Sequence, residues 1–120
     1  YGIDLSNNAF DAFPFAPLSI ETLTVMSIRQ QRDDEGNRTL REWPQGLYTC
    51  PKMSAFYIGS NDLGKIEDTI SPYILLFEIK DNPNISIDLS EVCPYIEMGY
   101  YELIYDSTQN IRGCDALNLD

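Results

Sequence analysis

The chain has 120 residues, 43% of them apolar, which predicts one domain spanning residues 1–120 around a single core. Eight Lys and Arg against nineteen Asp and Glu give a net charge of −11. This charge argues against nucleic-acid binding, because phosphate backbones are bound by clustered basic side chains. Histidine is absent, which excludes His-based acid–base catalysis, Ser–His and Cys–His nucleophiles, and the commonest metal ligand.

No apolar run approaches the roughly 18 residues that a membrane span needs, so we expect no membrane contact. The chain begins without Met and without a leader-like segment, which favours a mature or trimmed product. Neither a metal site nor a cofactor is expected.

The first predicted elements are an edge strand and a helix. Tyr1–Leu5 can add a strand at the edge of a sheet. Ser19–Gln31 is predicted to be a helix, because Ser19 can cap it and apolar residues recur on one face. Its middle, Leu23–Ile28, is β-branched enough to favour a strand as the alternative.

The most continuously apolar stretch is Ser71–Lys80, SPYILLFEIK. A short run of this kind predicts a central strand that is covered on both faces. Pro72 fits the first residue of such a strand, where no ladder donor is needed. Asn82-Pro83-Asn84 breaks the chain just after it, which argues against a helix.

Four further segments read as strands from their alternation or their β-forming residues: Met53–Ile58, Ile85–Leu89, Tyr100–Tyr105 and Ile111–Cys114. The last two would form a hairpin across Asp106–Asn110. The predicted class is therefore α+β, with one N-terminal helix on an antiparallel sheet of four or five strands. The sequence shows no evident internal repeat.

The cysteines are Cys50, Cys93 and Cys114. None lies in a CxxC pair, which argues against zinc. One disulfide with one free thiol is expected if the chain is secreted, and three reduced buried cysteines otherwise. Two N-glycosylation sequons begin at Asn37 and Asn84 and favour secretion slightly.

Three motifs in this order, Trp43-Pro44-Gln45, Ser71-Pro72-Tyr73 and the YYELIYDSTQNIRG segment, resemble the fungal guanyl-specific ribonucleases of the T1 type. The resemblance spans residues 19 to 117. The positions that carry catalytic His, Glu, Arg and His in that family are occupied here by Gln45, Leu75, Glu102 and Leu117. RNA transesterification needs a base, an acid and a positive charge at the phosphate, so this resemblance implies a fold without ribonuclease activity, and not an enzyme.

A ribonuclease-like scaffold without its catalytic residues resembles the secreted effectors of powdery mildew fungi. This resemblance implies a non-catalytic avirulence-type virulence factor, secreted and delivered into the host cytoplasm. Its partners would be a host plant protein and an intracellular immune receptor. Those effectors pair a first and a last cysteine; because the first is missing here, Cys50–Cys93 and Cys50–Cys114 are the alternatives.

Candidate partner contacts are an acidic loop and several tyrosines, since tyrosine is favoured at interfaces although strand tyrosines usually pack in the core. They are Asp33, Asp34, Glu35, Tyr48, Tyr73, Tyr100 and Tyr101. Two other functions stay open at this point. One is a non-cleaving, RNA-binding pseudo-ribonuclease, and the other is a carboxylate enzyme such as a glycosidase, which needs two acids facing one pocket.

Overall fold

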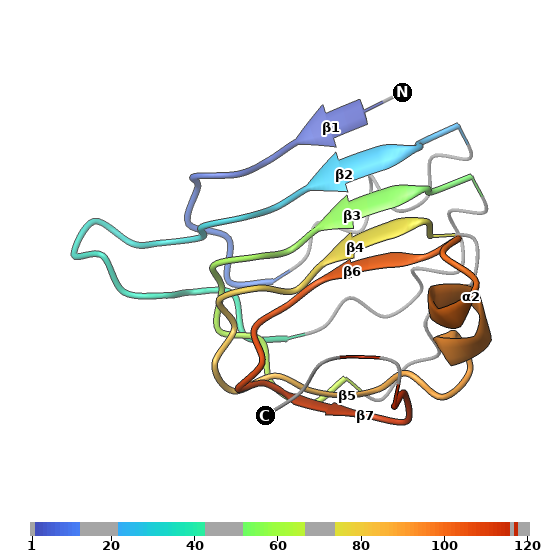
Figure 1. The fold of residues 1–120 in the computed structure, drawn as a ribbon. Coiled ribbons are helices and arrows are strands. Elements are labelled where there is room, and N and C mark those ends of the chain that lie inside the picture. The colour runs from blue at the N-terminus through green and yellow to red at the C-terminus, as the bar shows by residue number, and fades with distance from the viewer. Residues whose placement is uncertain (1, 13–21, 43–51, 67–73, 116, 118–120) are drawn as a thin grey trace.

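The computed structural model describes residues 2–12, 22–42, 52–66, 74–115 and 117. Its main sheet has five short strands in the order β1 (Gly2–Asp4), β2 (Val25–Ser27), β3 (Ala55–Tyr57), β4 (Leu76–Glu78) and β6 (Glu102–Ile104). Every neighbouring pair in this sheet is parallel. Figure 1 shows the five arrows stacked and pointing the same way.

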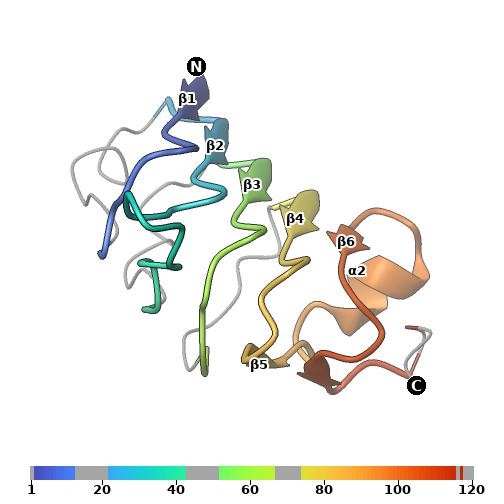
Figure 2. The ribbon, with the colours of Figure 1, turned by 90° about the vertical axis from the view of Figure 1, so that its left-hand side faces the viewer.

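Parallel neighbours require the chain to return to the same end of the sheet after each strand. Strands with successive numbers pair from β1 to β4, so the chain winds as a solenoid. We call each turn of the solenoid a coil. Coils 1 to 5 contain β1, β2, β3, β4 and β6, and each coil includes the few residues just before its strand. Figure 2 shows the strands stepping across the molecule in this order.

The same apolar spacing recurs in successive coils. Coils 2, 3 and 4 each contain three fully buried residues with the same spacing: the second follows the first by three positions, and the third follows the second by two. They are Leu23, Met26 and Ile28; Met53, Phe56 and Ile58; and Ile74, Phe77 and Ile79. The register aligns Met26 with Phe56, and Phe56 with Phe77. Corresponding residues of neighbouring coils therefore stack on one another inside the solenoid.

Each of the first four coils turns away from the sheet at one non-glycine residue with a positive φ. These residues are Asn7, Gln30, Ser60 and Asp81, with φ between 55° and 61°. Asn and Asp enter this left-handed region more readily than most residues, and Gln and Ser must be held in it by their surroundings. The recurrence of the conformation in register marks it as part of the repeat.

Buried amide side chains follow the strands of coils 2 to 5, directly after the turn in coils 2 to 4: Gln31, Asn61, Asn82 and Gln109. The Asn61 amide nitrogen donates to the carbonyl oxygens of Ile28 and Ile58, both at 2.9 Å. The Asn82 amide nitrogen likewise donates to Ile58, 3.1 Å away, and to Ile79, 2.9 Å away. Each asparagine thus joins its own coil to the preceding one, and we call this row the amide ladder.

A second, smaller layer lies opposite the main sheet. β5 (Ser86–Asp88) and β7 (Asn110–Arg112) form a parallel pair, and α2 (Cys93–Glu97) follows β5 (Figures 1 and 2). Ile87 of β5 and Ile111 of β7 are buried and aligned in register. The core therefore lies between the main sheet and this returning side of the coils. No helix in the described part of the chain is long and apolar enough to cross a membrane.

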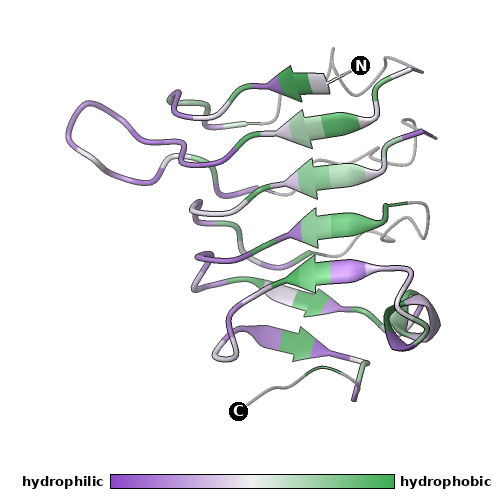
Figure 3. Cartoon of the chain, turned by 45° about the horizontal axis from the view of Figure 1, so that its top comes forward, coloured by the Kyte–Doolittle hydropathy of each residue, from purple (hydrophilic) through white to green (hydrophobic). Residues whose placement is uncertain are grey.

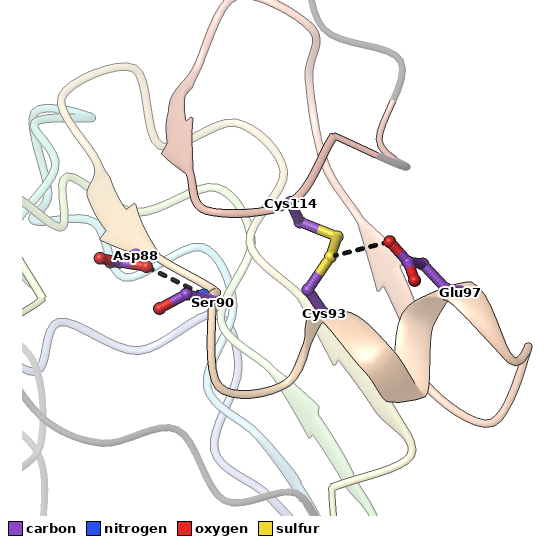
Figure 4. The surroundings of a disulfide bond; sticks show 5 residues. All are labelled: Asp88, Ser90, Cys93, Glu97 and Cys114. Atoms are coloured by element: carbon purple, nitrogen blue, oxygen red, sulfur yellow. Dashed lines mark hydrogen bonds between the residues drawn. A yellow bond between two sulfur atoms is a disulfide. The ribbon is translucent and has the colours of Figure 1, made fainter.

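The final coils are joined by a disulfide between Cys93 and Cys114, 21 positions apart in sequence (Figure 4). Cys93 is the first residue of α2, and Cys114 follows β7. Glu97 Oε1 lies 3.7 Å from Cys93 Sγ, a contact rather than a hydrogen bond, since a disulfide sulfur has no proton to donate. Because each cysteine holds the other, neither pairing through Cys50 occurs, and Cys50 itself lies outside the described residues.

Removing this disulfide is expected to lower the free energy of unfolding by about 3 kcal/mol, the loop-closure entropy for a loop of about this length. The test is urea unfolding of a Cys93→Ser, Cys114→Ser double variant, which leaves no new free thiol. The parent chain unfolded in the presence of a reductant is the control and should unfold as the double variant does. Equal urea midpoints for the double variant and the parent would contradict the prediction.

The predicted α+β class is wrong, because the main sheet is parallel and its second strand lies where the helix was expected. Within Ser19–Gln31, residues 19–21 are outside the described part, and Val25–Ser27 is β2. Buried residues three positions apart, Leu23 and Met26, fit a helix as well as they fit this coil, which explains the error. The alternative of a strand at Leu23–Ile28 is confirmed.

Most predicted strand positions are confirmed, although their pairing is not. Strands lie within Tyr1–Leu5, Met53–Ile58, Ser71–Lys80, Ile85–Leu89 and Tyr100–Tyr105. The expected hairpin is absent because β6 pairs with β4 and β7 pairs with β5. The reading of the sequence as free of repeats is wrong too, since coils 2 to 4 share one spacing.

Candidate functional site

The outward side of the main sheet carries the residues that alternate with the buried ones. We call it the outward face: Gly2, Asp4, Val25, Ser27, Ala55, Tyr57, Leu76, Glu78, Glu102 and Ile104 on the strands, with Arg29, Gly59, Lys80 and Asp106 just beyond. Figure 3 shows hydrophobic residues within the strands and hydrophilic ones in the loops beyond them. The face therefore combines small, apolar and charged side chains on one rigid scaffold.

A cluster of three long side chains lies across β2, β3 and β4. Arg29 Nε donates to Glu78 Oε1 at 2.6 Å, and the Arg29 guanidinium carbon lies 4.4 Å from the centroid of the Tyr57 ring. The Glu78 side chain is 14% exposed and that of Arg29 is 42% exposed. The carboxylate and the ring thus hold the guanidinium in place, by a charge-assisted hydrogen bond and a cation–π contact.

Gly59 makes this arrangement possible. The strand register places Gly59 between Arg29 and Lys80. The carboxylate of Glu78 lies close above the Cα of Gly59. Its backbone N–H donates to Glu78 Oε1 at 3.2 Å. A Cβ at this position would overlap Glu78 Oε1 and would lie 3.1 Å from the Lys80 carbonyl oxygen. Only the absence of a side chain lets the carboxylate reach Arg29.

Replacing Gly59 by Ala is expected to displace Glu78 and to lower the free energy of unfolding by about 1–2 kcal/mol, as overpacking does. Urea unfolding measures the change in stability, and NMR of the Arg29 Nε–H reports the loss of its acceptor. Gly64→Ala is the matched control, because a Cβ there meets nothing within 4 Å and its φ is not in the left-handed region. If both variants behave alike, the close approach at Gly59 has no energetic consequence.

An open cavity of about 510 Å³ lies at the end of these strands, lined by Arg29, Gly59, Ser60, Glu78, Lys80, Asp81 and Asp106. Its rim is fixed by hydrogen bonds to Asp81. Asp81 Oδ1 accepts from Arg38 Nη2 at 2.9 Å, and Asp81 Oδ2 accepts from Ser60 Oγ at 2.8 Å. The Arg38 hydrogen bond comes first among the causes that hold the pKa of Asp81 below its usual value.

Asp106 ties the last coil to this rim. Its Oδ2 accepts from the backbone N–H of Asp81 at 2.7 Å. Within the described residues, no three His, Cys, Asp or Glu side chains gather in a way that could hold a metal ion. The described carboxylates of the cavity thus serve as hydrogen-bond acceptors within the scaffold.

The predicted acidic loop lies away from this cluster. Asp33, Asp34 and Glu35 are exposed, in the loop closed by the isolated bridge between Arg32 and Arg38. This loop projects at the side of the solenoid in Figure 1. Asp33 Oδ1 accepts from the backbone N–H groups of Asn37 and Glu35, and the Asn37 bond is the first cause that lowers the pKa of Asp33. The aspartate therefore shapes the loop itself.

The predicted tyrosines are divided by burial. Tyr100 is 66% exposed and stays a candidate contact, whereas Tyr101 is 3% exposed. Burial raises the pKa of the Tyr101 phenol and leaves it unable to meet a partner at the surface. Tyr48 and Tyr73 lie outside the described residues.

Of the four positions that the ribonuclease resemblance singled out, the structure describes three. Leu75 and Glu102 lie on neighbouring coils, where the Glu102 N–H donates to the Leu75 carbonyl oxygen at 2.7 Å. Leu117 packs against the core near the last coil, and Gln45 lies outside the described residues. The cluster that the structure does form, Arg29, Tyr57 and Glu78, was not predicted, because only the parallel register brings these residues together.

Two solved structures are similar to this chain over nearly its whole length. One is a leucine-rich repeat protein from Bacteroides thetaiotaomicron, 53% identical over 98% of this chain with a TM-score of 0.95. The other is a leucine-rich repeat protein from Bacteroides eggerthii, 60% identical over 99% of this chain with a TM-score of 0.95. The chain spans only 14% and 19% of the lengths of those two proteins. No family model and no curated protein matches the sequence.

These similarities correct the earlier identification. The chain has the fold of a segment of bacterial leucine-rich repeat proteins, and it is neither a T1-type ribonuclease fold nor related to the powdery mildew effectors. The expected role as a plant-directed avirulence factor is therefore wrong, because it rested on that resemblance alone.

Proposed function

We propose that this chain contributes a non-catalytic recognition surface, and that its outward face binds a segment of a partner protein. Stacked repeats present extended surfaces on which neighbouring coils supply successive contacts. The observation that carries the proposal is the cluster of Arg29, Tyr57 and Glu78, which spans three coils on an exposed face. Arg and Tyr are among the residues most enriched at the energetic centres of protein interfaces.

The geometry of Arg29 supports binding rather than a purely structural role. Glu78 accepts from Nε, and no described residue accepts from the two terminal nitrogens of Arg29. Those nitrogens are held in position by the Tyr57 ring and can donate to a carboxylate or a backbone carbonyl of a partner. A donor that is already ordered loses less side-chain entropy when it binds.

Apolar contacts are available beside the polar cluster. Val25 of β2 and Leu75, just before β4, are exposed large hydrophobic residues near the amino ends of their strands. A partner segment that runs along the strands would meet the apolar amino ends and the charged carboxyl ends in turn. Such a mixed surface is typical of protein interfaces.

The disulfide supports a location outside a reducing cytoplasm. Disulfides persist in secreted, periplasmic and cell-surface proteins and are rare where thiols are kept reduced. Cys93 and Cys114 are both buried, as expected of a bond with a structural role. Export is thus part of this proposal.

The test is selection of a phage-displayed library of random 12-residue peptides against the folded chain, followed by affinity measurements on variants. We expect the enriched peptides to bind Arg29→Ala and Tyr57→Ala about 5–30-fold more weakly, the range for interface residues whose truncation removes 1–2 kcal/mol. Arg112→Ala is the matched control, because Arg112 is an exposed arginine on β7 in the opposite layer. Peptides that bind the Arg29 and Tyr57 variants as tightly as the parent, or no enrichment at all, would refute the proposal.

A further inference from the structure

The surface around α2 gathers exposed apolar side chains. Tyr95, Met98 and Tyr100 are 39%, 58% and 66% exposed, and they are three of the five large hydrophobic residues that the described part of the chain leaves exposed. We call these three residues the α2 patch. Figure 1 shows α2 beside the amino ends of the strands, whereas Arg29 follows the carboxyl end of β2. The patch is thus a surface separate from the Arg29 cluster.

The end of α2 fixes these side chains relative to one another. The N–H of Gly99 donates to the Ile96 carbonyl oxygen at 3.1 Å, and the N–H of Tyr100 donates to the Tyr95 carbonyl oxygen at 3.0 Å. With Gly99 at a φ of 82°, these bonds form a Schellman motif, in which the residues equivalent to Tyr95 and Tyr100 commonly contact each other. Tyr95 and Met98 are three positions apart and share one side of the helix. The three side chains therefore belong to one surface.

Both ends of this surface are anchored in the core. Cys93, the first residue of α2, is buried and forms the disulfide with Cys114. Tyr101, directly after Tyr100, is also buried. A surface that is held at both ends loses little conformational entropy when a partner binds to it. Exposed apolar residues that gather in one patch, rather than lie singly, indicate an interaction site.

The charge around the patch is of one sign. Residues 81–110 contain no Lys or Arg and six acidic residues: Asp81, Asp88, Glu91, Glu97, Glu102 and Asp106. We call Glu91, Glu97 and Glu102 the acidic rim, because they are exposed and lie within four positions of a patch residue. In the described part of the chain, no basic side chain forms an ion pair with any of the three. The negative charge beside the patch is therefore uncompensated.

We propose that the α2 patch docks a cationic amphipathic segment of a partner protein. The apolar side of the segment covers Tyr95, Met98 and Tyr100, and its Lys or Arg side chains meet the acidic rim. Charge complementarity selects this occupant. A second copy of the chain would bring two acidic rims together, and anionic lipid or nucleic acid would be repelled in the same way. The patch and its rim share only Glu102 with the outward face, so this proposal does not depend on the proposed function.

The test measures binding of a synthetic amphipathic helix made only of leucine and lysine, by isothermal titration calorimetry at low salt. We expect this peptide to bind, and the same peptide with glutamate in place of lysine not to bind. Met98→Ser and Tyr100→Ser, which keep the net charge, should each weaken binding about tenfold, as expected when a central interface side chain is lost. Val25→Ser is the matched control at an exposed residue outside the patch and should bind as the parent does. Arg29→Ala should not weaken binding, which separates this result from the outward face.

A second pair of variants tests the acidic rim. Glu91→Lys combined with Glu97→Lys should weaken binding of the lysine peptide about tenfold at low salt. The difference should shrink at high salt, because exposed charges are screened. Asp34→Lys combined with Glu35→Lys makes the same change in net charge in the acidic loop, and it should weaken binding much less.

Equal binding by the parent and all variants would show attraction by net charge alone and would overturn the proposal. Absence of binding by the parent would overturn it too. A dimer of the parent chain that Met98→Ser dissociates in sedimentation would make a second copy the occupant of the patch. Binding of the chain to phosphatidylcholine vesicles that Met98→Ser abolishes would make a lipid surface the occupant, and either result would replace the proposed partner.

Discussion

Replacing Asn61 by Ala is expected to lower the free energy of unfolding by about 3–5 kcal/mol, since the side chain satisfies several buried backbone groups at once. Its amide nitrogen donates to Ile28 and Ile58, and its oxygen accepts from Gln31. Asn61 is fully buried, so water does not replace these bonds in the folded variant. Both coils that the side chain joins lose partners together.

Chemical unfolding of the purified variant, followed by circular dichroism, measures this loss. Asn84→Ala is the matched control, because Asn84 is exposed and its amide donates to the side chain of Asp62 at 2.9 Å. A surface contact of this kind contributes a few tenths of a kcal/mol, about 0.5 kcal/mol at most. If Asn61→Ala changed stability by as little as the control, the amide ladder would not be a source of stability.

The strand positions could be predicted because the local pattern of apolar residues indicates which segments are buried. Alternation at Ile85, Ile87 and Leu89 reports burial, and those residues are buried. In the apolar run Ser71–Lys80, the residues Ile74, Phe77 and Ile79 are buried, whereas Leu75 is exposed, so the strand is not covered on both faces as expected. Pairing is a different property, because it depends on which distant segment returns beside a strand. Nothing local in Tyr100–Tyr105 distinguishes a hairpin with Ile111–Cys114 from the observed parallel pairing with β4.

The repeat was missed because its period and its residues vary. Met26, Phe56 and Phe77 are equivalent in register, yet the first two are 30 positions apart and the next two only 21. The inward positions hold Leu, Met, Ile and Phe, and the ladder position holds both Asn and Gln. The spacing of the buried residues around Asn61 and Asn82 was nevertheless present in the sequence, and comparing those two segments would have revealed it.

The cluster of Arg29, Tyr57 and Glu78 could not be predicted from the sequence, because it depends on how distant segments pair. Arg29, Tyr57 and Glu78 come from three coils, and the register alone brings them together. Glu78 lies inside the stretch that was taken for a ribonuclease strand, so that resemblance directed attention to Leu75 and Glu102 instead. Short motifs of three to five residues fit many folds, and their order along the chain did not discriminate between a ribonuclease and a solenoid.

Truncating Phe56 to Ala is expected to lower the free energy of unfolding by about 3–5 kcal/mol, the range for a large buried aromatic residue. Phe56 is the central residue of β3, and its ring lies parallel to that of Phe77, with the two centroids 6.0 Å apart and the planes 3° from parallel. The residue is fully buried, and the register places Met26 on its other side. The cavity would therefore separate coil 2 from coil 4 in the middle of the solenoid.

The stability of Phe56→Ala alone does not separate the loss of the stacked ring from the loss of side-chain volume. Phe56→Leu separates the two. Leucine keeps most of the volume and removes the stacked ring, and such a substitution should lower stability by less, about 1–1.5 kcal/mol. We also expect Phe56→Ala to change the pattern of amide exchange along the solenoid. In a solenoid each coil contacts only its neighbours, so Phe56→Ala should release the amides of β2, β3 and β4 before those near the Cys93–Cys114 disulfide. Uniform loss of protection across all five coils would show instead that the described solenoid unfolds as one cooperative unit.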